Sequence, residues 1–447
     1  TASGTYQGGG AIYNAARIYN IEGDFTSNYS GAYGGAILNN GATAVIDSIN
    51  GVFSQNTSVG GGAIANYNGA YIGSITGSFS QNTAPTGVYG GGAILNRSNG
   101  STIDSITADF TNNQASYGGG VIYNNNGTIN TIVGDFTGNS ALHGGAIATF
   151  DGTIRSLTGN FTNNVGTSTL AGAIYSSNST IGVEAGDRNV LFSNNTVSNG
   201  RYIDVHLTGK SGVEANSIFN LNAAQNKSIT FNGMINGGIL NNSYSGDINI
   251  NKTISYNTGD EDNPNIVTKP TGGQYIFNNN VQGNNIYIYN GADVKFGSYT
   301  QADSSTSYGQ IYQQSVNAAR VFQNDALGGT LDFRNGEIQA NTLGNVTLNS
   351  DLALKIDAKL NAASSANRAD SFSALSIAGG SSDFVIDSIT AITDTTNKYT
   401  KALVANDVLA SNFGLSASTL TATNAQGVTG TYTVRYGVDA TDNQGYL

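Results

Sequence analysis

A four-residue block recurs seven times in the first 200 residues of this 447-residue chain, and this repeat constrains the fold more than any other feature. The block reads Gly-Gly-Ala-Ile, apart from Val121 in place of Ala in one copy and Ala171 in place of the first Gly in another. It ends at Ile12, Ile37, Ile64, Ile94, Ile122, Ile147 and Ile174, so the copies are 25 to 30 residues apart. A period of this length indicates a solenoid, in which each repeat buries its apolar face against the next one.

A second motif, Phe-x-x-Asn, alternates with the first block. Its phenylalanines are Phe25, Phe53, Phe79, Phe110, Phe136, Phe161 and Phe192. Between the two motifs most copies read Ile-x-x-Ile-x-x-x-Phe, a spacing that also fits one face of a helix. Many β-branched residues and an interior glycine such as Gly134 disfavour a helix, since a glycine costs about 1 kcal/mol there. We therefore expect short strands joined by corners, and each corner resets which residues face inward.

Three apolar clusters per repeat fit one coil of a right-handed parallel β-helix, an all-β solenoid with about three short strands per coil. The isoleucines that end the first block would then stack in one ladder. Phe25, Phe53, Phe79, Phe110, Phe136 and Phe161 would stack in another. Two residues after the isoleucines come Asn14, Asn39, Asn66, Asn96 and Asn124, then Thr149 and Ser176, whose side chains we expect to bond between coils. The paired glycines are placed at corners where a side chain would obstruct the turn or the next coil.

The repeat divides the chain into three sections. Residues 1–200 are predicted to form regular β-helix coils, and residues 201–345 less regular coils with loops. Residues 346–447 are predicted to be a β-rich C-terminal cap, because Leu352, Leu354 and Ile356 alternate with polar residues as in a half-buried strand. Solenoids need a modified end that blocks edge-to-edge growth.

Composition excludes several classes of protein. The chain has no Cys, which removes disulfides and Cys-metal sites. It has a net charge of −11 and no lysine before Lys210, a poor match for nucleic acid or anionic lipid. No run of about 18 apolar residues is present, so we predict no transmembrane helix in this chain.

The ordered alternation of Gly-Gly-Ala-Ile and Phe-x-x-Asn over residues 8–195 resembles the chlamydial polymorphic membrane protein family, which are autotransporters with β-helical passengers. Residues Gly329 to Phe372 resemble a wider group of autotransporter passengers. The resemblance implies type V secretion and display at the bacterial cell surface, anchored through an outer-membrane barrel that this sequence lacks, or release outside the cell. It also implies a role as an adhesin or aggregation factor, and it carries over no catalytic residue.

Catalytic signatures are sparse, so we expect no enzyme, no cofactor and no metal centre. The two histidines, His143 and His206, have no evident companions for nucleophilic or zinc chemistry. One alternative is a glycan-processing β-helix enzyme, since Asp24, Asp109 and Asp135 precede the Phe in three repeats and clustered carboxylates cleave glycans. Another alternative is a structural subunit of a surface layer or filament.

Two kinds of binding residue remain. The acidic run Asp260, Glu261 and Asp262 could bind Ca²⁺ weakly. Tyrosines are the better candidates for an interface, since an exposed Tyr contacts glycans or proteins at low entropic cost. The candidates are Tyr13, Tyr123, Tyr175, Tyr287 and Tyr289, which alternate with inward-facing isoleucines and should point outward. The expected partner is a host or bacterial surface glycan or protein, or a second copy of the chain, and not a nucleic acid.

Overall fold

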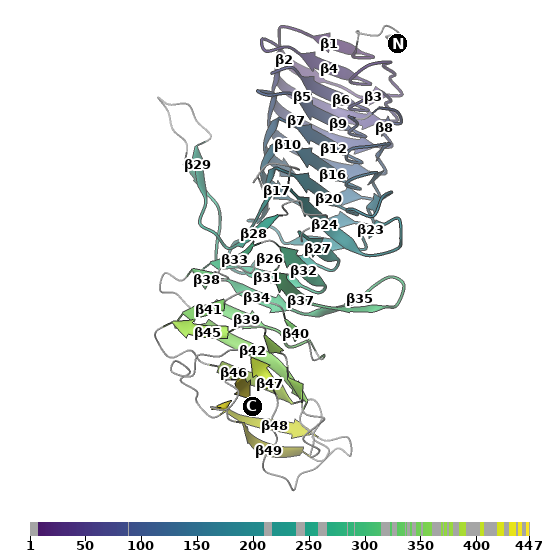
Figure 1. Ribbon diagram of the computed structural model, residues 1–447. Helices are drawn as coiled ribbons and strands as arrows, with labels where there is room; N and C mark the ends of the chain where they lie inside the picture. The colour runs from purple at the N-terminus through teal and green to yellow at the C-terminus, as the bar shows by residue number, and fades with distance from the viewer. Residues whose placement is uncertain are drawn as a thin grey trace. The chain divides into compact units, whose positions relative to one another are not determined.

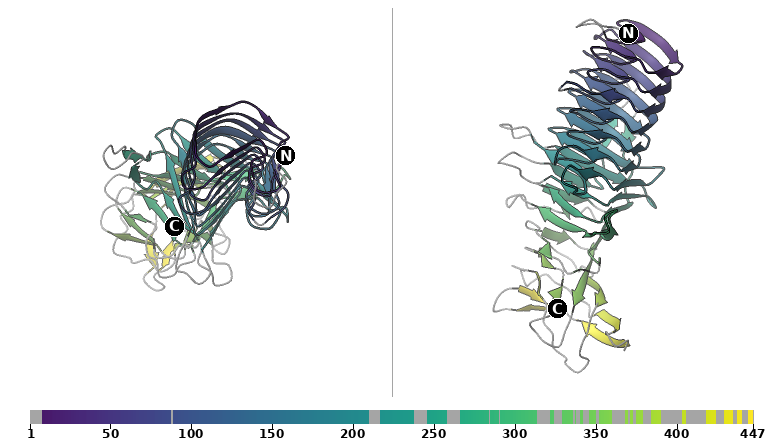
Figure 2. Two further views of the ribbon diagram at one scale, coloured as in Figure 1. Left: turned by 90° about the horizontal axis from the view of Figure 1, so that it is seen from above. Right: turned by 90° about the vertical axis from the view of Figure 1, so that its right-hand side faces the viewer.

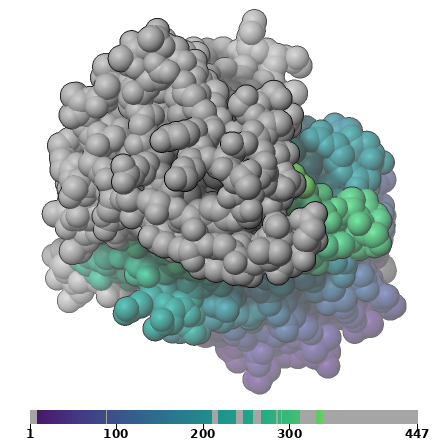
Figure 3. Space-filling model, turned by 90° about the horizontal axis from the view of Figure 1, so that it is seen from below, coloured from purple at the N-terminus to yellow at the C-terminus, as the bar shows by residue number. Residues whose placement is uncertain are grey.

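The structure is a computed structural model of the chain. It describes residues 8–87, 89–209, 217–237, 246–257, 266–283, 285–289 and 291–313, and shorter stretches between residues 322 and 446. Two compact units are present, one of Thr1–Asn220 and Phe231–Gly246, the other of Leu221–Thr230 and Asp247–Leu447. In both units the described secondary structure consists of β-strands (Figures 1 and 2). In the space-filling view of Figure 3, residues with described placement are coloured by their position in the chain.

The first unit contains a parallel sheet in which each ladder isoleucine begins a strand. The strands of this sheet lie one below another in Figure 1. Each strand pairs with the next so that equivalent residues are neighbours, as in Ile37 with Ile64 and Ile64 with Ile94. The strands in order are β1 (Ile12–Asn14), β4 (Ile37–Asn40), β6 (Ile64–Tyr67), β9 (Ile94–Arg97), β12 (Ile122–Asn125), β16 (Ile147–Phe150), β20 (Ile174–Ser177), β24 (Ile203–Thr208) and β27 (Met234–Asn236). The parallel β-helix predicted from the repeat is confirmed.

A second parallel sheet carries the Ile-x-x-Ile-x-x-x-Phe segments. Its strands in this unit are β2 (Arg17–Glu22), β3 (Phe25–Thr26), β5 (Val45–Ser54), β7 (Tyr71–Ser80), β10 (Thr102–Thr111), β13 (Thr128–Val133), β14 (Phe136–Thr137), β17 (Thr153–Thr158), β18 (Phe161–Thr162), β21 (Thr180–Ala185) and β22 (Val190–Ser193). A third, narrow sheet contains β8 (Thr83–Ala84), β11 (Gln114–Ala115), β15 (Ser140–Ala141), β19 (Val165–Gly166) and β23 (Thr196–Val197). A coil such as β9, β10 and β11 therefore has three strands, as expected.

The middle segment differs from the prediction of short strands joined by corners. In β5, β7 and β10 it is one strand of ten residues that passes through the expected corner. The inward side resets within the strand instead: Ile72 and Ile75 in β7 are both buried although they are three residues apart, and the same holds for Ile103 and Ile106 in β10. Neighbouring coils share the same irregularity, so the parallel hydrogen bonds continue across it.

The isoleucine and phenylalanine ladders form the core of the first unit. All their members are buried except Ile12 and Phe25, which lie in the first described coil and are half-buried. Successive phenylalanine rings stack with centroids 4.5 to 5.2 Å apart, from Phe25 to Phe161 and on to Phe192 and Phe231. This distance follows from the strand spacing of about 4.8 Å, because identical residues lie directly above one another.

The paired glycines have two different reasons for being glycine. In the first three coils the first glycine of the pair, such as Gly34 or Gly61, has a positive φ of 65° or 68° that a side chain disfavours. The second, as in Gly35, has normal dihedrals, but a Cβ there would lie 1.9 Å from the carbonyl oxygen of Gly62 in the next coil. The prediction that a side chain would obstruct the turn or the neighbouring coil is confirmed.

Two asparagine ladders line the corners. The predicted one is present: Asn39 Nδ2 donates to Asn66 Oδ1 at 2.9 Å, and Asn66 Nδ2 donates to Asn96 Oδ1 at 3.0 Å. The second consists of the Phe-x-x-Asn asparagines Asn28, Asn56, Asn82, Asn113, Asn139, Asn164 and Asn195. The residue before most of them has a φ near 55°, a turn that aims the amide along the solenoid.

The second unit continues with parallel pairs and short hairpins. Its parallel strands include β28 (Asp247–Ile250) with β33 (Asn285–Tyr289), β31 (Gln274–Phe277) with β34 (Asp293–Phe296), β32 (Asn280–Gly283) with β37 (Gln310–Gln313), and β39 (Gly329–Asp332) with β42 (Leu352–Lys359). The hairpins are β29 (Ser255–Asn257) with β30 (Ile266–Thr268) and β35 (Ser298–Thr300) with β36 (Thr306–Tyr308). Strands β25 (Ile218–Ala223) and β26 (Ser228–Phe231) span the boundary between the units.

The end of the chain is rich in strands. Within residues 346–447 these include β41 (Val346–Asn349), β45 (Leu375–Ala378), β46 (Phe384–Ile389), β47 (Leu403–Ala405), β48 (Ser418–Thr423), β49 (Thr429–Val434), β50 (Gly437–Asp439) and β51 (Gln444–Tyr446). Several pairs here are antiparallel, among them β48 with β49 and β50 with β51. The β-rich end expected after residue 345 is therefore present, and the division into three sections stays a prediction.

Candidate interaction surface

The carboxylates considered for glycan cleavage bond to the backbone of the next coil. An Asp109 oxygen accepts from the backbone N–H of Asp135 at 3.0 Å, and an Asp135 oxygen accepts from that of Asn160 at 2.8 Å. Asp24 accepts from the N–H of Val52 in the same way. Asp135 and Asn160 lie in the gaps between β13 and β14 and between β17 and β18, and Val52 lies opposite the gap between β2 and β3, so each donor is at a break in the parallel pairing. The carboxylates thus have a structural role as caps of the second sheet.

The two histidines lie in apolar surroundings. The His143 ring packs edge-on against Tyr117, with centroids 4.5 Å apart, and both of its nitrogens are buried without a hydrogen-bond partner. Burial lowers the pKa of His143 to about 4. His206 is buried in β24 with Nδ1 3.1 Å from Asn236 Nδ2, and burial, then the nearby His143, lowers its pKa to about 4.

Within the described part of the chain, neither histidine lies in a cluster of three or more metal-ligating side chains. In the described ranges no group of three or more His, Asp or Glu side chains is close enough to hold a metal ion. The acidic run Asp260, Glu261 and Asp262 lies outside the described residues, and weak Ca²⁺ binding there stays a prediction. Across the same described part of the chain, no helix is long and apolar enough to cross a membrane.

The five candidate tyrosines differ in exposure. Tyr13 is 53% exposed, and Tyr287 and Tyr289 are half-buried in the second unit. The expectation of exposure is wrong for Tyr123 and Tyr175, which are only 2% and 8% exposed. Both side chains do point away from the isoleucine ladder, because side chains alternate along a strand. They are buried because other side chains outside the solenoid cover this face of the first sheet.

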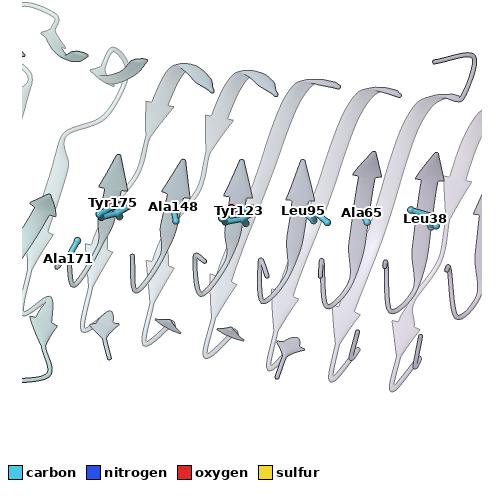
Figure 4. Packing of buried hydrophobic residues seen from close by; sticks show 7 residues of the cluster. All are labelled: Leu38, Ala65, Leu95, Tyr123, Ala148, Ala171 and Tyr175. Carbon is cyan, nitrogen blue, oxygen red and sulfur yellow. The ribbon is translucent and has the colours of Figure 1, made fainter. Parts of the chain in front are cut away.

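A second apolar cluster, which we call the outer cluster, consists of Leu38, Ala65, Leu95, Tyr123, Ala148, Ala171 and Tyr175. Figure 4 shows six of these side chains in a row, one on each successive strand from β4 to β20, with Ala171 beside the row. Tyr33, Tyr67, Phe150 and Leu170 pack against the cluster and are partly exposed. The first sheet is thus apolar on both faces, with the isoleucine ladder inside and the outer cluster outside.

Ring contacts connect the coils over this outer face. We define the aromatic stripe as Tyr33, Tyr67, Tyr89, Arg97, Tyr123, Phe150, Tyr175 and His206. Its successive ring pairs have centroids between 5.2 and 6.4 Å apart, and the Arg97 guanidinium fills the step between Tyr67 and Tyr89. Tyr89 is 37% exposed, so the stripe is open to solvent at that point.

The sequence does contain a signal for the stripe. Aromatic residues occur one or three positions after a ladder isoleucine, as in Tyr123 and Phe150, and just before the glycine pair, as in Tyr33 and Tyr89. These positions face the same side of the first sheet when the coils stack. The prediction treated each tyrosine separately and left out the loop residues before the glycine pairs. It therefore missed this arrangement.

One buried carboxyl group lies at a corner of the solenoid. Asp204 takes the position that is Ala173 in the preceding coil, and its side chain is fully buried. Burial raises the pKa of Asp204 to about 7, although hydrogen bonds from Asn195 and the Gly233 N–H act in the opposite direction.

Comparison with known proteins supports the resemblance drawn from the two motifs. The model of the Chlamydia polymorphic membrane protein repeat matches residues 107–125. This stretch includes Phe110 and Asn113 of one Phe-x-x-Asn motif and the following Gly-Gly-Val-Ile block that ends at Ile122. No curated protein matches the chain. The chain thus carries a repeat of the Chlamydia polymorphic membrane protein type on a parallel β-helix, a combination that fits the surface passenger domain of an autotransporter-type protein.

Proposed function

We propose that the chain is a bacterial surface passenger that acts as an adhesin or aggregation factor, and that the partly exposed members of the aromatic stripe form its contact surface. The partly exposed aromatic residues along successive coils are the observation that carries this proposal. Aromatic side chains contribute large contact areas at low entropic cost, so they are favoured at interfaces. The partner is a host or bacterial surface glycan or protein, or a second copy of the chain.

The solenoid supports the same role. Stacked coils hold equivalent residues at a fixed spacing, so several weak contacts act together and increase the overall affinity. Location at the outer membrane, or release from the cell, agrees with the repeat type. A binding role is favoured over glycan cleavage because Asp24, Asp109 and Asp135 accept hydrogen bonds from the backbone.

Binding of protein-coated beads to cells tests the proposal. Tyr67→Ala and Tyr89→Ala should reduce binding, since both residues belong to the stripe. Tyr19→Ala is the matched control, because Tyr19 is 72% exposed in β2 and lies outside the stripe. Equal binding by all three variants and the unchanged chain would contradict the proposal.

Light scattering separates adhesion from assembly. A structural subunit of a surface layer or filament should increase in particle mass as protein concentration rises. An adhesin whose partner is a glycan or a different protein should keep a constant mass in the absence of that partner.

A further inference from the structure

We propose that Arg97, together with Tyr67 and Tyr89, binds a carboxylate-bearing sugar such as a uronic or sialic acid. This inference rests on the proposed adhesive function and names the chemical class of its ligand. It depends on the position of one cation within the aromatic stripe.

Three aromatic residues hold the Arg97 side chain. The guanidinium carbon lies 3.7 Å from the ring centroid of Tyr89 and 5.4 Å from that of Tyr67. Arg97 Nη1 donates a hydrogen bond to Tyr33 Oη at 3.2 Å. The parallel register places Tyr67 directly beside Arg97 in the preceding coil, while Tyr89 comes from the segment that precedes β9. These contacts restrict the guanidinium before any ligand arrives.

No carboxylate among the described residues lies within 4.0 Å of Arg97. Two other arginines of the same unit are paired with carboxylates: Arg17 with Asp47 at 2.9 Å, and Arg188 with Asp135. The hydrogen bond to Tyr33 uses one of five N–H donors, so the guanidinium retains donors for a ligand. The neighbours of Arg97 in its column, Tyr67 and Asn125, are neutral. The site therefore has positive charge in a chain whose net charge is −11.

The chemistry of the site selects the ligand. A guanidinium matches a carboxylate with two parallel N–H···O bonds, and such charged bonds are stronger than neutral ones. The exposed ring of Tyr89 and the half-buried rings of Tyr33 and Tyr67 offer apolar surface beside the charge. A pyranose ring has a rigid apolar C–H face that can lie on an aromatic ring. An acidic peptide offers the carboxylate on a flexible chain without that face, so we favour the sugar.

Isothermal titration calorimetry with two probes tests the inference. The probes are hyaluronan oligosaccharides and sialyllactose, each compared with its carboxyl-reduced form, in which the acid is replaced by an alcohol. We expect at least one acid form to bind at least tenfold more tightly than its reduced form. Arg97→Gln should remove that difference, and Arg97→Lys should retain part of it because it keeps the charge.

Arg17→Gln is the matched control. Arg17 also lies over a tyrosine, with 5.0 Å to the ring centroid of Tyr19, but it is paired with Asp47. This variant should bind the acid probes as the unchanged chain does. Circular dichroism of every variant should retain the β spectrum, so that a loss of binding reports on the site and not on the fold.

Three results would overturn the inference. One is that neither acid form binds more tightly than its reduced form, and another is that Arg97→Gln binds both as the unchanged chain does. The third is that a poly-glutamate peptide binds as tightly as the sugars and with the same dependence on Arg97, which would assign the site to an acidic protein. If cell binding depends on Tyr89 but not on Arg97, this inference fails while the proposed function stands. If the unchanged chain binds no cells, the proposed function fails.

Discussion

Asn195 Nδ2 donates a hydrogen bond to a carboxyl oxygen of Asp204 at 2.8 Å, and this bond ends the second asparagine ladder. In the preceding coils the acceptor is always the asparagine of the next Phe-x-x-Asn motif, as for Asn164 and Asn195. The following coil has Met234 three residues after Phe231, and methionine cannot continue the ladder. Asp204, from the column otherwise filled mainly by alanine, supplies the missing acceptor.

Asp204 should make the stability of the chain depend on pH. Its pKa is raised from 3.8 to about 7 by burial, so between these values the folded chain binds more protons than the unfolded chain. The contribution of Asp204 therefore decreases as pH rises through this window, by at most about 1.4 kcal/mol per pH unit. Denaturant unfolding of the unchanged chain and of Asp204→Asn from pH 4 to 8 should show a stability difference that shifts in favour of the variant with rising pH. Thr111→Ala, an exposed change that removes no titrating group, is the control and should show no such trend.

His143 should make the stability of the chain depend on pH in the opposite direction to Asp204. Burial lowers its pKa from 6.5 to about 4. The contribution of neutral His143 to the free energy of unfolding is therefore complete above pH 6.5 and decreases as pH falls toward 4. His143→Phe keeps an aromatic ring in the cluster and removes two buried nitrogens that lack partners. We expect a gain of about 1 kcal/mol at pH 7 and a larger gain at pH 5, measured by thermal unfolding. A variant less stable than the unchanged chain at pH 5 would show that the nitrogens have a partner in solution.

Asn113→Ala should strongly destabilise the solenoid. Asn113 Oδ1 accepts from the backbone N–H and the Nδ2 of Asn82, and its Nδ2 donates to the carbonyl of Phe79 and to Asn139 Oδ1. Truncation leaves these buried groups without partners, which should cost about 3 kcal/mol. Thr111→Ala, an exposed change in the same coil, should alter stability by less than about 0.5 kcal/mol. Similar unfolding midpoints for the two variants would refute a stabilising role of the ladder.

Gly35→Ala should be one of the most damaging single changes in the repeat. The added Cβ would lie 1.9 Å from the Gly62 carbonyl oxygen, and backbone on both sides cannot retreat without breaking the parallel pairing. We expect a loss of more than about 3 kcal/mol, or no soluble protein. Gly186→Ala is the control, because its nearest contact would be 3.6 Å away at the end of the Glu184 side chain. Full stability of Gly35→Ala would contradict the close approach of the coils.

The sequence by itself determined the coil, the register and the inward-facing ladders. A repeat of the same residues every 25 to 30 positions places equivalent residues of adjacent coils next to each other. The neighbours of Ile64 or Phe79 in the sheets can therefore be predicted from the repeat alone. The requirement for the glycine pairs was also visible in the sequence. It arises from the backbone dihedral angles of the turn and from the close approach of one coil to the next, and both recur with the repeat.

Tertiary structure alone decided which outward-facing residues are covered. Tyr13 and Tyr123 occupy the same position in their repeats, yet one is exposed and the other is buried. The difference depends on side chains from other coils and from loops of variable length, such as Tyr89 and Phe150, which pack on the outer face. The contacts of Arg97 with Tyr33 and Tyr89 and the end of the ladder at Asp204 likewise join residues whose distance in the sequence follows no period, so only the folded chain brings them together.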